Sequence, residues 1–199
     1  MRPLPAVLAV AAGACSAHAD PLVADRPDFT ESASAVEAGR LQLEMGYTAV
    51  VDDGDTQNYI PEPLLRIGVL EGVELRIAWG GVYFDGERSE GTDFGLAFKY
   101  VLPAPEDDPL RLGFILGVSL PTGGSETSAE VVVPGLKLLW SYALTDRLSV
   151  AGNLNFGAPE SSEGRRIGES QASLALALSL TEEIGAFVEY FGIYPWQDD

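Results

Sequence analysis

Residues 134–157 form two arms of about ten residues each, in which apolar side chains alternate with smaller or polar ones. One face of the first arm carries Leu136, Leu138, Trp140 and Tyr142, and the other carries Gly135, Lys137, Leu139 and Ser141. Side chains on a β-strand alternate faces with a period of two, so the pattern predicts a strand, a short turn at 143–147 and a second strand. Each arm is long enough to cross a bilayer as a tilted strand. This pattern constrains the chain to antiparallel hairpins.

The same alternation continues along the chain and predicts about nine strands. We expect them at 40–51, 59–69, 73–79, 93–100, 110–120, 134–142, 148–157, 173–180 and 184–190. Most connections after odd-numbered strands are longer and polar, whereas those after the second, sixth and eighth are short. Transmembrane β-barrels show this asymmetry between their two ends. The predicted fold class is therefore all-β, an antiparallel up-and-down transmembrane β-barrel.

The N-terminus has the features of a targeting segment. Arg2, an apolar run and Ala17-His18-Ala19 predict a secretory signal peptide over 1–19. The alternative is a lipobox with Cys15 acylated. We expect a periplasmic segment at 20–38 and a barrel domain over 39–199. Cleavage after Ala19 would remove the single Cys and the single His, leaving no disulfide, no His-based triad and no His or Cys metal site.

The charge balance excludes one class of partner. The chain has 30 acidic against 12 basic residues, a formal net charge of −18. Binding phosphates needs basic patches, so we expect no nucleic-acid partner. Disorder can also produce such acidity, but 46% hydrophobic residues with long alternation argue against it.

Alternation alone does not separate a membrane barrel from a soluble one, which turns its apolar face inward. Two features favour the membrane: the less apolar face is rich in Gly, Ala, Ser, Asn and isolated charges, and aromatic residues gather near strand ends. Arg at Leu136, Leu138 or Leu176 should then be destabilising, whereas Arg at Asn153, on the inner face, should be tolerated.

Several stretches resemble one known family. They are 24–32, with Asp-Arg-Pro-Asp-Phe-Thr-Glu-Ser as the most specific part, 39–47, the Leu-Thr-Asp-Arg-Leu turn at 144–148, and Glu-Tyr-Phe-Gly at 189–192. The chain is similar over most of its mature length to the phenol degradation meta-pathway family of outer-membrane proteins. This resemblance implies an outer-membrane β-barrel linked to uptake of small, often aromatic, compounds. It supplies no substrate-binding positions.

Charged and amide side chains on the inner face are the candidate lumen-lining residues. They are Glu44, Glu62, Arg66, Glu74, Arg76, Lys99, Arg111, Lys137, Asn153, Asn155 and Glu189. A turn at 70–72 would place Arg66 opposite Arg76, with Glu74 one step away diagonally, and two opposed cations need neighbouring carboxylates or water. The set predicts either a solute-selecting constriction or a structural salt-bridge network that fills the interior, and packing favours the network. Residues 25–28 could form a periplasmic tether or a plug.

No enzyme motif, P-loop or dinucleotide fingerprint is present, so we expect no catalysis, no cofactor and no metal. The predicted function is a bacterial outer-membrane channel or transporter for small, in part aromatic, solutes, in contact with outer-membrane lipids. The alternative is a non-conducting barrel that is structural or binds a ligand or partner. Single-chain barrels have even strand numbers, so nine strands also predict a C-terminally incomplete barrel, with a barrel closed by a second chain as the alternative.

Overall fold

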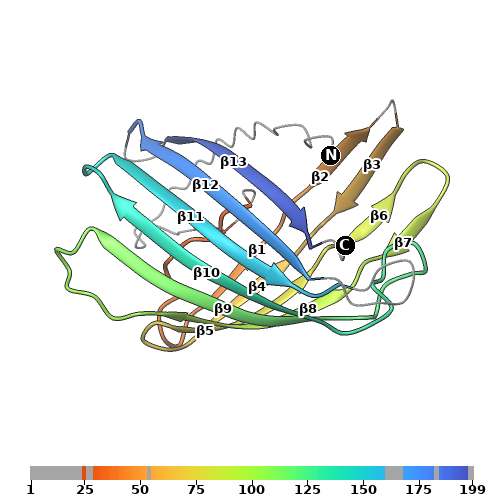
Figure 1. The fold of residues 1–199 in the computed structure, drawn as a ribbon, viewed down its shortest axis with the longest axis horizontal. Coiled ribbons are helices and arrows are strands. Elements are labelled where there is room, and N and C mark those ends of the chain that lie inside the picture. Colours follow the sequence, from red (N-terminus) through yellow and green to blue (C-terminus); the bar gives the residue numbers. More distant parts are fainter. Residues whose placement is uncertain (1–23, 26–28, 53–54, 160–167, 182–183, 197–199) are drawn as a thin grey trace.

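The computed structural model describes residues 24–25, 29–52, 55–159, 168–181 and 184–196. The predicted signal peptide and the apolar run within it lie outside these residues. The described chain is all-β (Figure 1), with the strands β1 (Leu41–Glu44), β2 (Thr48–Asp52), β3 (Asp55–Ile60), β4 (Leu64–Leu70), β5 (Val73–Trp79), β6 (Val82–Phe84), β7 (Ser89–Gly91), β8 (Phe94–Val101), β9 (Leu110–Leu120), β10 (Val133–Ala143), β11 (Leu148–Gly157), β12 (Glu169–Ser179) and β13 (Gly185–Pro195). Among these residues no helix is long and apolar enough to cross a membrane.

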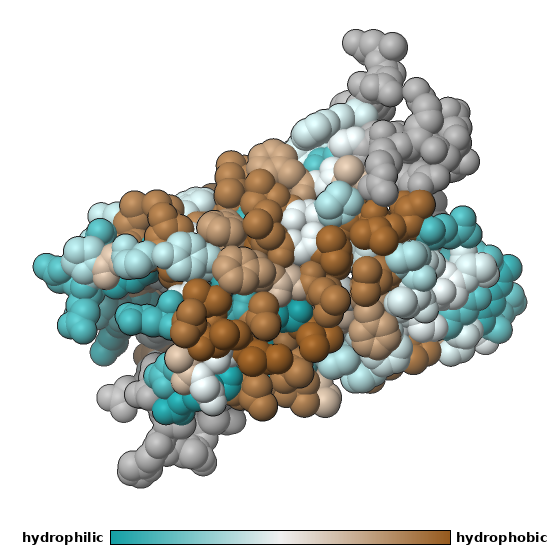
Figure 2. All heavy atoms as spheres, turned by 90° about the horizontal axis from the view of Figure 1, so that it is seen from below, coloured by the Kyte–Doolittle hydropathy of each residue, from teal (hydrophilic) through white to brown (hydrophobic). Residues whose placement is uncertain are grey.

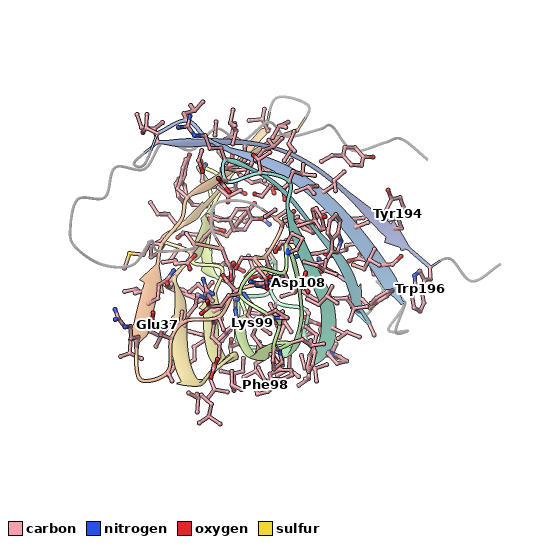
Figure 3. The ribbon with its side chains drawn as sticks, turned by 90° about the vertical axis from the view of Figure 1, so that its left-hand side faces the viewer. Glu37, Phe98, Lys99, Asp108, Tyr194 and Trp196 are labelled. Carbon is pink, nitrogen blue, oxygen red and sulfur yellow. The ribbon has the colours of Figure 1, made fainter. Side chains whose placement is uncertain are left out.

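Nine of the strands form one antiparallel sheet in the order β1-β4-β5-β8-β9-β10-β11-β12-β13. Neighbours in this sheet are successive in the chain except where β2, β3, β6 and β7 form a separate four-stranded sheet. The large sheet curls strongly, so that it has a concave and a convex face (Figures 1 and 3). Within the described residues no backbone pairing joins β1 to β13. The predicted antiparallel, hairpin-by-hairpin architecture is confirmed.

The bounds of β5 and β9 are those that the alternation predicts, whereas the strands before β5 differ. The single strand expected at 40–51 is divided into β1 and β2, because Gly46 N–H donates to the carbonyl of Pro61 at 2.8 Å and the chain turns away from β4. The strand expected at 59–69 is likewise divided at Pro61 and Pro63, which have no N–H for a ladder. β6 and β7 lie in the stretch predicted as a loop, and β12 and β13 run longer than expected.

The two faces of the large sheet differ in chemistry. The convex face carries exposed apolar side chains such as Leu116, Leu138 and Leu176, which are 50%, 42% and 42% exposed. Figure 2 shows hydrophobic residues gathered across the middle of one side of the molecule, with hydrophilic residues toward both ends. The buried polar and charged side chains lie on the other face, and in Figure 3 Lys99 points inward where its neighbour Phe98 points outward.

Candidate functional site

The candidate site is the concave face of the large sheet, where successive strands place charged side chains in register. Arg66 on β4 pairs with Arg76 on β5, and Glu74 on β5 pairs with Lys99 on β8. Their alternate spacing on each strand sends all four side chains to the same face. Arg66, Glu74 and Lys99 are 1%, 0% and 0% exposed. A charge this deeply buried must be paired, and here every charge has partners.

Glu74 offsets the repulsion between the two opposed arginines. Arg66 donates to it from Nε at 2.8 Å and from Nη2 at 2.9 Å, so this pair is bidentate. Arg76 Nη1 donates to Glu74 Oε1 at 3.3 Å. Arg66 Nη1 also donates to Glu44 on β1 at 3.0 Å. The position of Arg66 opposite Arg76, and the diagonal carboxylate, are those that the turn at 70–72 predicts.

The described N-terminal residues 24–25 and 29–36, called here the inner segment, lie against this face. Asp25 Oδ2 lies 2.7 Å from Arg76 Nη1, 3.1 Å from Lys99 Nζ and 3.4 Å from Arg66 Nη1. Its Oδ1 accepts the Ser32 N–H at 2.8 Å, and its own N–H donates to Glu44 at 3.0 Å. Burial raises the pKa of Asp25, but Lys99, Arg66 and Arg76 together hold the pKa well below its usual range. Asp25 is therefore ionised at neutral pH.

Glu31 makes the second ionic anchor of the inner segment. Its Oε2 lies 2.6 Å from Arg76 Nη2, and its Oε1 lies 2.7 Å from Lys137 Nζ on β10. Its backbone is held by Asn153 on β11, which is 1% exposed. With the Asn153 amide oriented to satisfy both groups, Oδ1 accepts the Glu31 N–H at 2.8 Å and Nδ2 donates to the Glu31 carbonyl at 3.1 Å. These contacts fix both the side chain and the backbone of Glu31.

Further contacts hold the rest of the inner segment. Glu189 on β13 accepts the N–H groups of Phe29 at 2.9 Å and Thr30 at 2.6 Å, together with the Thr30 hydroxyl. The Phe29 ring stacks on Phe191, with ring centroids 4.6 Å apart. At the other end of the segment, Val36 N–H donates to Glu74 at 2.9 Å. Of the two possibilities open at 25–28, plug or tether, the described Asp25 has the position of a plug; residues 26–28 lie outside the described residues.

Two cavities lie on opposite sides of the inner segment. The first, of about 870 Å³, is lined by small residues such as Ala33, Ser34 and Ala175 and by the turns at 106–109 and 144–147. The second, of about 590 Å³, lies toward the long-loop end and is lined by Phe29, Glu31, Arg76 and Lys137 among others. Because residues of the inner segment line both, the segment divides the concave space.

The structure brings most of the predicted lumen residues together. Glu44, Arg66, Glu74, Arg76, Lys99 and Lys137 belong to the ion-pair network, and Asn153 and Glu189 hold the inner segment. Asn155 lines the second cavity; its Nδ2 donates to Gln171 at 3.3 Å, and its buried Oδ1 has no hydrogen-bond partner among the described residues. Because Asn153 is buried against Glu31, the expectation that Arg is tolerated there is wrong: the larger side chain would displace the segment.

Two predicted residues lie away from the network. Arg111 lines the first cavity but donates to carbonyl oxygens of its own turn, those of Glu106 and Asp108. Glu62, between β3 and β4, accepts the Thr48 hydroxyl at 2.8 Å near the small sheet. Local alternation did not identify Asp25, Thr30 or Glu31 as site residues, because they lie in no strand. The unbalanced cations of the predicted inner face, and the family-like stretch at 24–32, were the signals that could have indicated them. Among the described residues no cluster of His, Cys, Asp and Glu is placed to hold a metal ion.

Comparison with known proteins identifies a family. The model of the family described as "Putative MetA-pathway of phenol degradation" matches residues 24–199. The match covers most of the chain, and the protein belongs to this family, as the sequence resemblance predicts. No curated protein and no solved structure matches the chain.

Proposed function

We propose that this member of the MetA-pathway phenol degradation family is a β-barrel of the bacterial outer membrane, and that it passes small solutes, aromatic compounds among them, through its lumen. The observation that carries the proposal is the inverted burial of the large sheet. Arg66, Glu74 and Lys99 are buried on the concave face, while the leucines of the convex face are exposed. A lipid-facing exterior explains this distribution, since a soluble barrel would turn the same leucines inward.

The convex face supports the membrane part of the proposal. Exposed large apolar side chains occur on every strand of the large sheet. Soluble monomers rarely expose contiguous apolar patches larger than a few hundred Å². The seven inner strands of the sheet are paired along both edges, as the hydrocarbon core of a bilayer requires, whereas within the described residues β1 and β13 are each paired along one edge. Trp79 and Phe94 stack at the long-loop ends of β5 and β8, 5.5 Å between ring centroids, where an interfacial aromatic girdle is expected.

The concave face supports the transport part. The two cavities, about 870 and 590 Å³, have the volume of small-molecule sites and lie at the two ends of the lumen. Among the described residues, the inner segment and the ion-pair network lie between them. The arrangement is that of a solute path closed at its middle, so we assign the structure to a closed state.

The alternative is a non-conducting barrel that is structural or binds a ligand or partner, and the ion-pair network itself favours a structural role. Its central side chains are fully buried and all paired, which is how small barrels fill their interiors. In that case the inner segment is a permanent part of the core.

Planar-bilayer recordings and liposome swelling with the purified, reconstituted chain separate the two functions. The transport proposal predicts discrete conductance steps and swelling in small sugars or small aromatic solutes, and recovery of the protein in the outer-membrane fraction. A folded, membrane-inserted protein that shows neither conductance nor solute flux, also when the inner segment is loosened by substitution, would contradict it.

A further inference from the structure

The strands contribute more cations than carboxylates to the ion-pair network, and the inner segment neutralises this excess. Within the described residues the ion-pair network joins the cations Arg66, Arg76, Lys99 and Lys137 to the carboxylates Asp25, Glu31, Glu44 and Glu74. All four cations but only two of the carboxylates, Glu44 and Glu74, belong to the strands. Without the inner segment, the wall of this network would hold two uncompensated positive charges.

We propose that Asp25 and Glu31 occupy a binding site for the carboxylate group of an anionic solute, and that such a solute opens the lumen by displacing them. This inference rests on the proposed transport function and names its substrate class. The inner segment is then an internal stand-in for the solute.

The contacts of Asp25 and Glu31 are those expected of bound carboxylates. Each forms ion pairs with more than one cation. Asp25 lies within 3.4 Å of Arg66, Arg76 and Lys99, and Glu31 pairs with both Arg76 and Lys137. Arginine side chains and ammonium groups arranged in this way recognise carboxylates through charge-assisted hydrogen bonds. An incoming carboxylate can therefore replace these contacts one for one.

Access to the site is from the second cavity. Lys137, whose side chain is 36% exposed, lines this cavity together with Arg76 and Glu31. Asp25 also borders this cavity, but its side chain and that of Lys99 are 0% exposed. A solute carboxylate entering from the long-loop end would meet Lys137 first and compete with Glu31, before it reached the cations around Asp25.

Charge also explains why displacement needs an anion. Withdrawal of the inner segment alone would leave the cations of the wall unpaired in a region of low dielectric constant, which is strongly unfavourable. A neutral solute offers no compensation. Glu189, the other buried carboxylate near the segment, lies outside the network and accepts N–H groups of Phe29 and Thr30 instead.

The direct test uses the wild-type chain and needs no conductance. Hydrogen exchange of the backbone amides in 29–36 is measured with benzoate and with its neutral isostere benzamide, at the same concentration and ionic strength. We expect benzoate to accelerate exchange in this segment several-fold and saturably, and benzamide to leave it unchanged. Equal exchange rates with both compounds, or an exchange rate that does not change with benzoate concentration, would overturn the inference.

A second test uses the Asp25→Asn, Glu31→Gln double variant in planar bilayers with a KCl gradient. We expect a larger open probability than in wild type and a reversal potential shifted toward the chloride equilibrium potential. Glu37→Gln is the matched control, because Glu37 pairs with Arg40 where both side chains are 59% exposed. A conducting but cation-selective double variant would overturn the anion site and leave the channel intact. Absence of conductance in every folded variant, with the benzoate-dependent exchange retained, would instead overturn the channel alone.

Discussion

Leu138 and Leu139 are neighbours on β10, yet the first is 42% exposed and the second 2% exposed. Leu138 lies on the convex face of the sheet. Leu139 packs with Ile115 and with Ala33 of the inner segment in the small apolar core beside the ion-pair network. Identical side chains thus have opposite environments, because strand geometry alternates their direction. Whether Leu138 contacts water or lipid therefore decides whether the convex face is the membrane-facing side of the sheet.

Leu138→Arg should strongly destabilise the membrane-inserted protein. Leu138 lies at the middle of β10, where a lipid-facing Arg costs about 2–4 kcal/mol near the bilayer midplane. The measurement is reversible folding into lipid vesicles in a urea titration. Leu144→Arg is the control: Leu144, 50% exposed, follows β10 in the turn to β11, where the expected cost is about 0–1 kcal/mol. Equally small losses of folding free energy for the two variants would indicate that both side chains face water.

Glu74→Gln should destabilise the fold by about 3–5 kcal/mol, since removing one partner of a buried ion pair leaves the other charge uncompensated. Glu74 contacts both Arg66 and Arg76 and also accepts the Val36 N–H, so the substitution affects the strands and the inner segment together. The same titration measures it. Glu37→Gln removes an exposed carboxylate and should change stability by about 0–1 kcal/mol. A similarly small effect of Glu74→Gln would contradict the central place of this carboxylate.

Gly68→Ala should displace the end of the inner segment from β4. A Cβ at Gly68 would lie 1.9 Å from the carbonyl oxygen of Glu37, a backbone atom that has to move. Gly135→Ala, on β10, is the matched control, because its Cβ would come no closer than 3.7 Å to Phe156 O. We expect faster hydrogen exchange in 29–36 and lower stability for Gly68→Ala only. Two variants with indistinguishable exchange would show that the segment does not pack on β4 in solution.

Asp93 should make the loop after β9 sensitive to acid. Burial opposes its ionisation, but its carboxylate accepts the N–H groups of Ala129, Gly123 and Thr122, which together lower its pKa. A carboxyl group with a lowered folded-state pKa contributes stability above its unfolded pKa of about 3.8, and loses it as pH falls through the folded value. The difference in melting temperature between wild type and Asp93→Asn should therefore be present at pH 6 and vanish at low pH. A constant difference across this range would contradict the assignment.

The sequence predicts the strands wherever local alternation decides them. β5 and β9 have the expected bounds, and the register of β4 and β5 follows from the turn between them, so Arg66 was expected opposite Arg76. The division at 45–47 was not predictable, since the alternation continues unbroken through these residues. It depends on the hydrogen bond from Gly46 to Pro61 and on the pairing of β2 with β3.

The candidate site was predictable only in part, for a related reason. Alternation identifies which strand residues face inward, and so finds the cations Arg76, Lys99 and Lys137. Their partners Asp25 and Glu31 come from a segment without periodicity, 51 positions from Arg76 and 106 positions from Lys137, respectively. Charge balance on the inner face shows that partners are missing but does not say which acidic residues supply them.

The lipid-facing exterior is tested most directly by measuring the membrane depth of β10 and which of its faces contacts lipid. Single cysteines at Leu138 and Gly135, with Cys15 replaced by Ser, are labelled with an environment-sensitive fluorophore, and the protein is reconstituted with lipids that carry a quencher on their acyl chains. Gly135 suits the comparison because it lines the second cavity, where a label has room. A lipid-facing Leu138 and a lumen-facing Gly135 predict strong quenching at Leu138→Cys and little at Gly135→Cys. Equal quenching at both positions, or none at Leu138→Cys, would contradict the lipid-facing exterior.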